Sequence, residues 1–457
     1  MTKLTEKVYF SLPYSLQNIA VSILGLKLKR ERYGNHSQKK VFEISKEYQS
    51  KDTKSVIDRC FVEIAKHAVR NTTFYKELAR REKFGADDIR GIEDINRFPV
   101  INKHSIIENP ESFILNDSRL RGGRFHLYTS GTTGTPLKVT TDIQSRQEHY
   151  AFFSSLRAEY GVKTNDRRAT IMGRVITTQE EQRHFWRHDY FNKNLLFSSY
   201  HLSENNIELY YEKLISYSPD EIFSYPSSLY EIALWMLAHK KPKIRLKLII
   251  LTAERFLQNQ ANAIRSAFDA PIVDQYGCTE MMFFGTRRDV ELPMRLNHLH
   301  GYSEVLDTLG SISSRGQGTH IATGFINYSM PIIRYNTGDN ISLEFDSITG
   351  TQNILDMDGR KDDLIITKDG RKIGRLDPIF KSELNIKYAQ IIQSPDLSLT
   401  INIVPLRTFS DQNEKILREE LEKRIGKGMI LDIILVDDIE RTNSGKFRPV
   451  ISHAEQN

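Results

Sequence analysis

Residues 127–140, LYTSGTTGTPLKVT, combine six Ser or Thr side chains and two glycines with a single lysine, Lys138. Backbone N–H groups and short hydroxyls in a loop of this composition can approach a polyanion, and the lysine adds a positive charge. The segment therefore predicts a site for a phosphate chain. It is not a Walker A loop, because Lys138 follows Gly134 by four residues and the order G-x-x-x-x-G-K-[ST] is absent. On composition alone, an ordinary solvated turn is the alternative.

Three further segments carry side chains suited to nucleotide chemistry. In residues 274–280, DQYGCTE, Tyr276 offers an aromatic face, Gly277 permits a sharp exit from a strand, and Glu280 supplies a hard oxygen ligand for magnesium. In residues 334–339, RYNTGD, Asp339 follows a glycine and is placed to accept both hydroxyls of a ribose, although an ordinary Asp–Gly turn has the same pattern. Residues 441–448, RTNSGKFR, form a loop that presents Lys446.

The elements that must position these segments alternate between strands and helices. A strand at residues 125–128 leads into the first loop, which places that loop at a strand's carboxyl end, where open α/β sheets bind ligands. From Asp220 onward, short apolar runs alternate with amphipathic stretches, which predicts βαβ units and a largely parallel sheet ending at residues 274–280. The expected strands are 166–172, 222–225, 246–252, 271–275 and two runs within 318–328, and the expected helices are 52–79 (capped by Asp52 or Thr53), 141–158, 227–239 and 258–268.

The pattern of predicted strands and helices changes after residues 359–363, GRKDD. Short strands at 389–392 and 399–404 precede a helix opened by Asp411, with Glu414 three residues later in a capping-box pattern, and a strand at 429–436 follows. We interpret residues 359–362 as a linker. The predicted division is an N-terminal ATP- and acyl-binding domain, residues 1–358, and a C-terminal lid domain, residues 359–457, that carries Lys446.

Five motifs in a fixed order are more specific than any one of them. YTSGTTGTPLKV, YGCTE, RYNTGD, GRKDD and NSGK resemble the adenylate-forming superfamily of acyl-CoA synthetases, nonribosomal adenylation domains and luciferases. The segments LPYSLQN, TAERF and HLHGYSEVLD make the chain most similar to the phenylacetate–CoA ligase branch, and within it to the CapK-like proteins associated with capsular polysaccharide synthesis. The resemblance implies an α/β fold, with a large domain of βαβ sheets and a small, mobile α+β C-terminal domain.

The resemblance also implies a role for each matching residue. Tyr276 would lie against the adenine, with Gly277 and Thr279 beside the nucleotide, and Glu280 would ligate magnesium. Asp339 would bind the ribose hydroxyls with help from Arg360, and Asp362 would be the hinge of the C-terminal domain. Lys446 would be the catalytic lysine, and Glu280 and Thr132 would act with it. The ATP phosphates would be held by Thr129, Ser130, Gly131, Thr132, Thr133, Gly134 and Lys138.

The implied activity is ATP-dependent adenylation of a carboxylic acid with release of pyrophosphate, followed by acyl transfer to a thiol, or to an amine or hydroxyl of a sugar precursor. ATP and magnesium are the implied cofactors, and the setting is cell-surface polysaccharide biosynthesis. A phenylacetate-like acyl-CoA ligase is one alternative, and a non-catalytic nucleotide-binding scaffold is another. After GRKDDLIITKDG the chain continues RKIGRLDPIF, where many CoA-forming relatives have an apolar–Pro step, so CoA as the acceptor stays open.

Composition bounds these interpretations. The chain has 457 residues, 39% of them hydrophobic and 27% charged, with a net charge of +6, which indicates a globular protein of two or three domains and excludes a disordered one. Its two cysteines, Cys60 and Cys278, exclude a disulfide framework and a four-Cys zinc site, and they suit a reducing cytoplasm. No secretory start is visible, and we expect a cytoplasmic protein that binds no nucleic acid.

Several basic and histidine-bearing segments leave alternatives open. A basic cluster spans Lys27, Lys29, Arg30, Arg32, Lys39 and Lys40 and predicts a solvated helix face, with contact to a nucleic acid or to an anionic membrane surface as the alternative. Similarly, residues 12–28 predict a helix packed on the body, or an amphipathic helix lying on a membrane as a peripheral association. His184 and His188 lack a third metal ligand, and Cys278, His298 and His300 lack a fourth for zinc, so we expect structural or acyl-pocket histidines.

Overall fold

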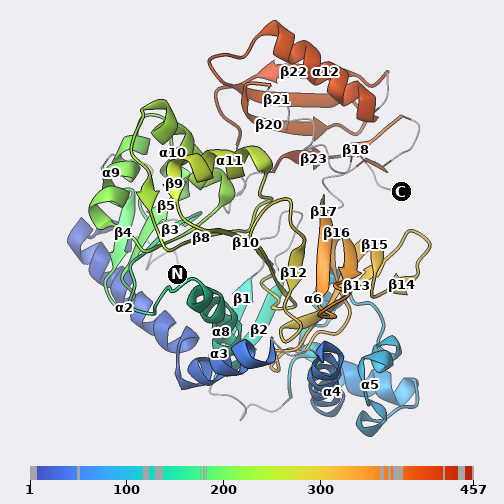
Figure 1. The fold of residues 1–457 in the computed structure, drawn as a ribbon. Helices are drawn as coiled ribbons and strands as arrows, with labels where there is room; N and C mark the ends of the chain where they lie inside the picture. The colour runs from blue at the N-terminus through green and yellow to red at the C-terminus, as the bar shows by residue number, and fades with distance from the viewer. Residues whose placement is uncertain are drawn as a thin grey trace.

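A computed structural model describes residues 8–48, 52–116, 123–128, 137–174, 176–178, 181, 183–360, 365–368, 372–373, 384–425, 428–440 and 448–454. One mixed sheet is built from strands between residues 168 and 360 (Figure 1). Within the described ranges it has 13 strands, in the order β14-β13-β15-β16-β17-β12-β11-β10-β8-β6-β3-β5-β4. The expected α/β class is confirmed, with a separate α+β unit at the C-terminal end.

The parallel half of this sheet agrees with the predicted βαβ units. Its strands β3, β5, β6, β8 and β10 pair in parallel, and β4 adds an antiparallel edge next to β5. Their bounds are β3 (Arg168–Met172), β4 (Trp186–Asp189), β5 (Asn194–Ser198), β6 (Glu221–Ser224), β8 (Leu248–Thr252) and β10 (Ile272–Gly277). The helices that accompany them are α8 (Ile143–Glu159), α9 (Ile207–Tyr217), α10 (Pro226–Ala238) and α11 (Gln258–Ala267).

Alternate residues of a central strand face helices on opposite sides of the sheet. Leu248 and Ile250 of β8 belong to the hydrophobic cluster that α8 covers, whereas Ile249 and Leu251 belong to the cluster that α10 and α11 cover. A strand covered on both faces is apolar at every position, and this explains the run LIIL. The edge of this half that is predicted to bind a ligand is formed by the carboxyl ends of its parallel strands.

The predicted end of the sheet at residues 274–280 is wrong. β10 pairs antiparallel with β11 (Phe284–Arg287), and the sheet continues for seven more strands within the described residues. Sequence patterns show where a strand ends but not what pairs beside it, and the chain here turns back on itself. These strands are β12 (Met294–Leu296), β13 (Gly301–Leu306), β14 (Ile312–Ser313), β15 (Gly316–Gly324), β16 (Tyr335–Phe345) and β17 (Gln352–Arg360).

Helices near the N-terminal end flank the sheet. The predicted helix 52–79 is two helices, α4 (Thr53–Asn71) and α5 (Thr73–Arg81), because Thr72 adopts an extended conformation with φ −120° and ψ 151°. Asp52 caps α4 as expected, its Oδ1 accepting a hydrogen bond from Ser55 N at 3.1 Å. The remaining elements here are α2 (Tyr14–Arg32), α3 (Asn35–Glu47), η1 (Ala86–Asp88), η2 (Ile92–Arg97), α6 (Lys103–Glu108), α7 (Pro110–Phe113) and η3 (Ser199–His201).

The C-terminal unit has its own sheet and core. Its four strands pair in the order β22-β21-β20-β23, and α12 (Asp411–Ile425) packs on them through Leu417, Leu421 and Ile425. The expected capping box is shifted by one residue, since Ser410 N and Oγ both donate to Asn413 Oδ1. The four strands are β20 (Ile386–Gln393), β21 (Leu399–Pro405), β22 (Leu431–Leu435) and β23 (Val450–Ser452), and β18 (Ile365–Ile366) and β19 (Lys372–Ile373) form a separate two-stranded sheet.

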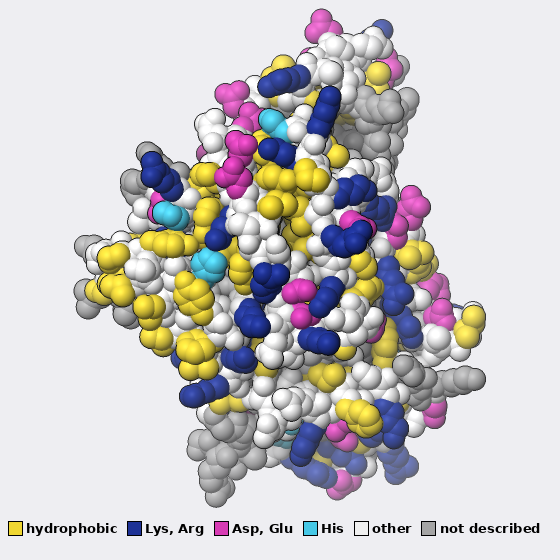
Figure 2. Space-filling view, turned by 60° about the vertical axis from the view of Figure 1, so that its left-hand side comes forward, with side chains coloured by type: hydrophobic (Ala, Val, Ile, Leu, Met, Phe, Trp, Pro, Cys, Tyr) yellow, Lys and Arg dark blue, Asp and Glu magenta, His cyan; other side chains and the backbone are white. Residues whose placement is uncertain are grey.

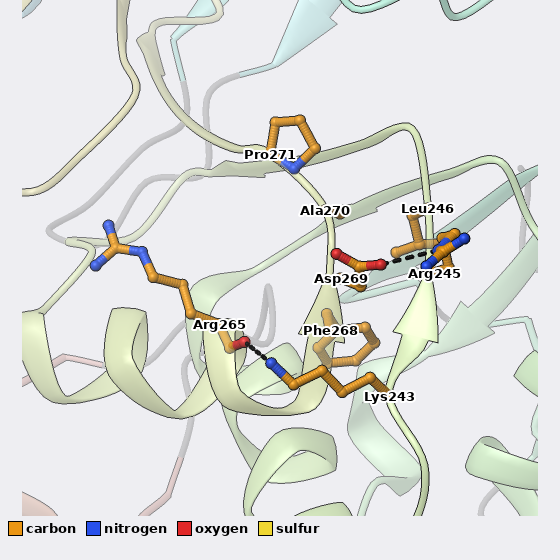
Figure 3. Close-up of a pocket in the computed structure, with 8 residues that line it drawn as sticks. All are labelled: Lys243, Arg245, Leu246, Arg265, Phe268, Asp269, Ala270 and Pro271. Carbon is orange, nitrogen blue, oxygen red and sulfur yellow. Dashed lines mark hydrogen bonds and ion pairs between the residues drawn. The ribbon is translucent and has the colours of Figure 1, made fainter.

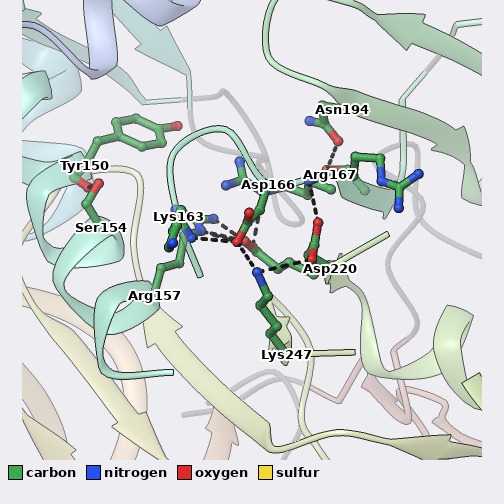
Figure 4. A network of polar contacts seen from close by, with 12 residues as sticks. Tyr150, Ser154, Arg157, Lys163, Asp166, Arg167, Asn194, Asp220 and Lys247 are labelled. Carbon is green, nitrogen blue, oxygen red and sulfur yellow. Dashed lines mark hydrogen bonds and ion pairs between the residues drawn. The ribbon is translucent and has the colours of Figure 1, made fainter. Parts of the chain in front are cut away.

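A polar network ties together the amino ends of the parallel strands (Figure 4). Lys247 Nζ lies 2.7 Å from Asp166 Oδ2 and 3.2 Å from Asp220 Oδ1, and Arg167 N donates to Asp220 Oδ2 at 2.9 Å. This edge of the sheet is therefore closed by ion pairs, opposite the edge that carries the predicted motifs.

No helix in the described part of the chain is long and apolar enough to cross a membrane.

Candidate active site

The predicted phosphate loop is the connection of a β-hairpin. β1 (Arg124–Tyr128) pairs antiparallel with β2 (Lys138–Asp142), and Tyr128 is opposite Lys138. The loop thus follows a strand's carboxyl end as predicted, but that strand belongs to a two-stranded sheet and not to the open parallel sheet. Lys138 begins the returning strand. The other loop residues, Thr129, Ser130, Gly131, Thr132, Thr133 and Gly134, lie outside the described residues.

A buried carboxylate holds this hairpin in place. Asp142, at the end of β2, is fully buried, and its Oδ2 accepts a hydrogen bond from Ser329 Oγ at 2.6 Å. The same side chain caps α8, because its Oδ1 accepts from Ser145 N at 2.8 Å. Asn327 Nδ2 also donates to Thr140 O at 3.0 Å. The hairpin is therefore fixed both to α8 and to the segment between β15 and β16.

The two ends of the loop adjoin the second motif. Leu137, which follows the loop, is buried in the hydrophobic cluster that contains Met282 and Phe283. Leu127, which precedes the loop, packs against the same cluster, as do Tyr276 and Cys278. The described residues on either side of the loop therefore share one hydrophobic cluster with residues at the carboxyl end of β10.

Tyr276 and Asp339, 63 residues apart in the chain, meet in the structure. The Tyr276 hydroxyl donates to Asp339 Oδ2 at 2.5 Å and lies 3.3 Å from His320 Nδ1. His320 Nε2 in turn lies 2.8 Å from Ser303 Oγ. Burial lowers the pKa of His320 to about 3, so this imidazole is neutral. The predicted adenine and ribose residues therefore form one hydrogen-bonded chain with a neutral histidine.

Sequence reasoning missed His320 and Ser303. Both lie inside apolar strands, His320 on β15 and Ser303 on β13, and each is fully or almost fully buried. A single polar residue in a buried strand needs a hydrogen-bond partner. That requirement was the available signal, but it does not identify the partner.

Glu280 is a buried carboxylate just beyond β10. It is 9% exposed, and Tyr335 Oη donates to its Oε1 at 3.3 Å. Gly277 is exposed at the end of the strand and Thr279 is half-buried. Burial, and then the neighbouring Glu280, raise the pKa of Cys278 well above its ordinary value. The Cys278 thiol is thus protonated.

Arg360 is the last residue of β17 and the Cα partner of Asp339 on β16. The structure thereby brings the two residues predicted for the ribose onto neighbouring strands. Residues 359 and 360, which open the predicted linker, continue this strand. The predicted hinge Asp362 and the predicted catalytic lysine Lys446 lie outside the described residues.

Aromatic and basic side chains gather on α8 next to the second motif. His149 Nδ1 lies 3.1 Å from His300 Nε2, and Phe153 packs edge-on against Phe284 of β11. Arg32 and Arg146 both lie over the Tyr150 ring, at 4.6 and 5.6 Å from its centre. The buried Nε atoms of these two arginines have no hydrogen-bond partner within the described ranges.

The histidine segments do not gather as metal ligands. His298 stacks on Tyr48 with ring centres 5.7 Å apart, and His300 contacts His149. His188 lies on β4 and stacks on Tyr190. Among the residues that the structure describes, no group of three or more His, Cys, Asp or Glu side chains is placed to hold a metal ion.

The C-terminal unit contacts α10, a helix that packs on the large sheet. Lys387 Nζ lies 2.9 Å from Glu231 Oε2 of α10, and Tyr388 Oη donates to Ser227 O at 3.3 Å. Tyr230 and Tyr388 pack together with Val404 and Ile439. These contacts join β20 to the amino-terminal half of α10.

Two surface recesses lie away from these motifs. One is lined by Lys243, Arg245, Leu246, Arg265, Phe268, Asp269, Ala270 and Pro271 around β7 (Ile244–Arg245) and β9 (Phe268–Asp269) (Figure 3). It lies at the amino ends of β8 and β10, and its cations already have partners: Arg245 pairs with Asp269 at 2.8 Å and Lys243 donates to Arg265 O. The other recess, lined by residues that include Arg167, His188, Tyr190 and Lys193, adjoins β4. Neither contains a predicted site residue.

Solved structures show the class of fold. The 2-hydroxyisobutyryl-CoA ligase in its postadenylation state, in complex with R3-HIB-AMP, superposes with a TM-score of 0.67 at 17% identity, over 87% of this chain and 89% of that chain. The same ligase in its thioesterification state, in complex with 2-HIB-AMP and CoA, gives a TM-score of 0.51 over 88% and 90%. The chain has the fold of an adenylate-forming ligase of the acyl-CoA ligase type.

Sequence comparisons place the chain more narrowly. Residues 365–453 match the CapK C-terminal domain family. Protein CapK of Staphylococcus aureus is 24% identical over 98% of this chain and 99% of its own length. Phenylacetate-coenzyme A ligase of Aromatoleum evansii is 24% identical over 66% of this chain and 69% of its own. The expected resemblance to the CapK-like proteins and the phenylacetate–CoA ligases is confirmed.

Proposed function

We propose that the chain adenylates a carboxylic acid with ATP and then transfers the acyl group to an acceptor. The observation that carries this proposal is the convergence of the loop ends at Leu127 and Leu137 with Tyr276, Glu280 and Asp339. In the first step a carboxylate oxygen attacks the α-phosphorus, the bond from that phosphorus to the bridging oxygen breaks, and pyrophosphate leaves. In the second step the acceptor attacks the acyl carbon, loses its proton, and AMP leaves.

The residues fit the charge problem of the first step. A carboxylate and a triphosphate repel each other, so a catalyst must neutralise charge and align the two reactants. We assign the phosphates to residues 129–134 with Lys138, the base to Tyr276, Gly277 and Thr279, and the ribose to Asp339 and Arg360. Lys446 would stabilise the developing charge on the α-phosphoryl group, and Thr132 would act with it.

Magnesium fits the carboxylate of Glu280. This group offers a hard oxygen donor, and its Oε1 accepts a hydrogen bond from the neutral hydroxyl of Tyr335 at 3.3 Å. When bound, magnesium would neutralise charge on the phosphates. Within the chain, Glu280 would hold the ion, and Tyr335 would orient the carboxylate.

We further propose that residues 1–358 form the nucleotide- and acyl-binding domain and residues 359–457 a lid that turns about Asp362. The contacts of β20 with α10 support a docked position for this lid. The higher TM-score with the postadenylation form than with the thioesterification form of one ligase supports an arrangement of the former kind. A lid that turns would expose the adenylate to the acceptor.

The acceptor has two candidates. The resemblance to CapK-like proteins favours an amine or hydroxyl of a sugar precursor in cell-surface polysaccharide biosynthesis. The relatedness to phenylacetate-coenzyme A ligases favours CoA as the acceptor. A non-catalytic nucleotide-binding scaffold is disfavoured because Glu280, Asp339 and Lys446 are all retained.

ATP–pyrophosphate exchange tests the first step. The panel should include aromatic, aliphatic, hydroxy and amino acids, and also acids with a second anionic group, because the buried Nε atoms of Arg32 and Arg146, beside the Tyr150 ring, have no hydrogen-bond partner within the described ranges. We expect exchange with one class of acid. Mass spectrometry after adding CoA or an amino sugar then identifies the acceptor. Absence of exchange with every acid, together with tight ATP binding, would support the scaffold instead.

The Lys446→Ala variant tests the assigned catalytic lysine. We expect ATP binding to persist while exchange falls by about a hundredfold or more, because a donor to transition-state charge is lost. The Lys415→Ala variant, in the same C-terminal unit, is the matched control. Equal exchange by the Lys446 variant and the unchanged chain would remove the assignment.

A further inference from the structure

The helix α2 is packed with its polar face inward. Its buried residues are Gln17, Asn18, Ser22 and Gly25. Its outward face carries Leu16, Ile19, Ile23 and Leu24, whose side chains are between 44% and 63% exposed. A helix on the surface of a globular protein ordinarily shows the reverse arrangement. The prediction that residues 12–28 pack on the body is confirmed, but the apolar stripe is not what packs.

The inward polar face is explained by the edge of the large sheet. β4 is the last strand, and one side of it pairs with β5. On its other side, His188 N donates to Asn18 Oδ1 at 2.9 Å and Tyr190 N donates to Ser22 Oγ at 3.0 Å. An uncovered edge strand exposes such groups, and α2 satisfies them.

Close packing fixes which way the helix faces. A Cβ built at Gly25 would lie 2.1 Å from Asp189 Oδ2, so any other residue here would require the Asp189 carboxylate to move. Asn192 Nδ2 also donates to Gly25 O at 2.9 Å, and Arg187 Nε donates to Gln17 Oε1 at 2.6 Å. The helix is therefore held in one rotation about its axis. The outward position of the apolar stripe follows from these contacts.

Aromatic side chains extend the apolar stripe. Tyr190 and Phe191, at the end of β4, are 60% and 51% exposed. Lys29 Nζ donates to Phe191 O at 3.2 Å, which ties this turn to the helix. Figure 2 turns this side of the molecule forward and shows hydrophobic side chains gathered on its left flank, with Lys and Arg side chains beside them. Exposed apolar patches of this kind mark interaction sites.

The charged residues of α2 are four cations and one acidic residue, Glu31. Residues 8–30 include Lys27, Lys29 and Arg30 and contain no Asp or Glu. The Lys27 side chain is 73% exposed, and the nearest acidic group on the helix, Glu31, lies 3.9 Å from it. Of the predicted basic cluster, Arg32 and Lys40 are engaged elsewhere, Arg32 over Tyr150 and Lys40 with Glu43 and Glu148. The cations at the end of α2 remain on the surface.

We propose that α2 and the adjoining Tyr190 and Phe191 form a docking surface for an anionic membrane. The aliphatic stripe would enter the boundary between headgroups and acyl chains, and Lys27 and Arg30 would meet lipid phosphates. The Tyr190 ring at the margin suits this depth, because its apolar body and its polar hydroxyl both find partners there, and the Phe191 ring adds apolar area. The docking surface rests on α2 and β4 alone and does not depend on the proposed function.

Vesicle flotation with the full chain tests this surface. We expect binding to phosphatidylcholine–phosphatidylglycerol vesicles at low salt, weaker binding at high salt, and little binding to pure phosphatidylcholine. The pair Ile19→Ser and Ile23→Ser should lower the affinity by at least about tenfold, because two exposed aliphatic chains no longer leave water. The matched control is the pair Leu309→Ser and Ile348→Ser, since both residues are 89% exposed in turns elsewhere.

Charge variants and a depth probe complete the test. Lys27→Gln and Arg30→Gln should each lower the affinity for anionic vesicles about fivefold, because one cation near such a surface contributes about 1 kcal/mol. The tryptophan of an Ile23→Trp variant should be quenched by brominated lipid. Absence of flotation by the unchanged chain at low salt would overturn the proposal. The proposal would also be overturned if the unchanged chain were a dimer, and if the Ile19→Ser and Ile23→Ser pair made it a monomer without changing flotation.

Discussion

Single side chains carry the strongest local constraints around the candidate site. Asp339 accepts a hydrogen bond from Tyr276, and Tyr276 lies within reach of a histidine that burial holds neutral. One carboxylate oxygen is thus already oriented before a nucleotide arrives. We therefore propose different roles for the two residues. Asp339 would contact the ribose, and Tyr276 would face the base and also orient the Asp339 carboxylate.

Asp339→Ala should raise the KM for ATP in pyrophosphate exchange. A hydrogen bond to a charged group contributes about 1.5–3 kcal/mol, so we expect an increase of about tenfold to a hundredfold. Tyr276→Phe keeps the aromatic face and removes only the neutral donor, and its increase should be no more than about tenfold. Steady-state exchange at varied ATP measures both. A Tyr276 effect larger than the Asp339 effect would contradict the assigned roles.

Arg334 is the second residue-scale constraint. Its guanidinium pairs with Glu304 through Nε to Oε2 at 2.9 Å and Nη2 to Oε1 at 2.6 Å, and both side chains are 6% exposed. The same group donates to Phe98 O and Asn96 Oδ1, which ties residues 96–98 to β13 and β16.

Arg334→Met should lower the free energy of unfolding by about 3–5 kcal/mol, because Glu304 is left buried without its partner. Urea unfolding followed by circular dichroism measures the change. The double variant Arg334→Met with Glu304→Leu should recover part of the loss, since no unpaired charge remains. A single variant as stable as the unchanged chain would show that the ion pair is not needed.

At the scale of elements, the parallel half of the sheet could be predicted and the antiparallel half could not. β6, α10, β8, α11 and β10 follow from runs of apolar residues whose lengths and periods differ between strand and helix. Antiparallel pairing beyond β10 depends on contacts such as β12 with β17, which are far apart in the chain. The break between α4 and α5 was missed because Thr72 fits the helical apolar period while its backbone is extended.

The candidate site divides in the same way. The resemblance identified Tyr276, Glu280 and Asp339, and the structure brings the first and third into contact. His320 and Ser303 carry no local pattern, because a polar residue in a buried strand finds its partner only through folding. Residues 129–134, Asp362 and Lys446 stay predictions, since they lie outside the residues that the structure describes.

The contact between β20 and α10 can be tested directly for its role in docking the C-terminal unit. Lys387 and Glu231 have side chains 17% and 13% exposed, so their ion pair is largely shielded from water. Lys387→Ala should loosen the docked C-terminal unit, raise the radius of gyration in small-angle scattering, and slow exchange. The control Arg407→Ala removes an exposed cation from the same unit. Exchanging the two charges, with Lys387→Glu and Glu231→Lys together, should restore compactness, and failure to do so would disfavour the ion pair as the cause.

The whole molecule combines one continuous sheet with several buried neutral imidazoles. Burial is the main reason that the pKa of His149 falls to about 3, that of His298 to about 4 and that of His320 to about 3. His149 lies on α8, His298 in the turn between β12 and β13, and His320 on β15. Protonation of these histidines is therefore linked to the unfolding of the whole protein.

Stability should fall with acidity well before the carboxylates titrate. Unfolded histidines gain a proton below about pH 6.5, whereas the folded ones stay neutral to about pH 4. The unfolded state then binds more protons, so the free energy of unfolding is highest above about pH 6.5 and falls by about 1.4 kcal/mol per histidine for each pH unit below it. Urea midpoints at two pH values measure this. His320→Gln should reduce the slope, and midpoints that do not change with pH would contradict the neutral state.

The β-hairpin that carries the predicted phosphate loop has a consequence for how such a protein can be modified. Asp142 anchors its returning strand to α8, and its own two strands pair only with each other among the described residues. The loop can therefore be exchanged or lengthened without altering the register of any strand in the large sheet. A loop from a relative with another nucleotide preference could therefore be grafted between Tyr128 and Leu137, while Leu137 keeps its place in the hydrophobic cluster.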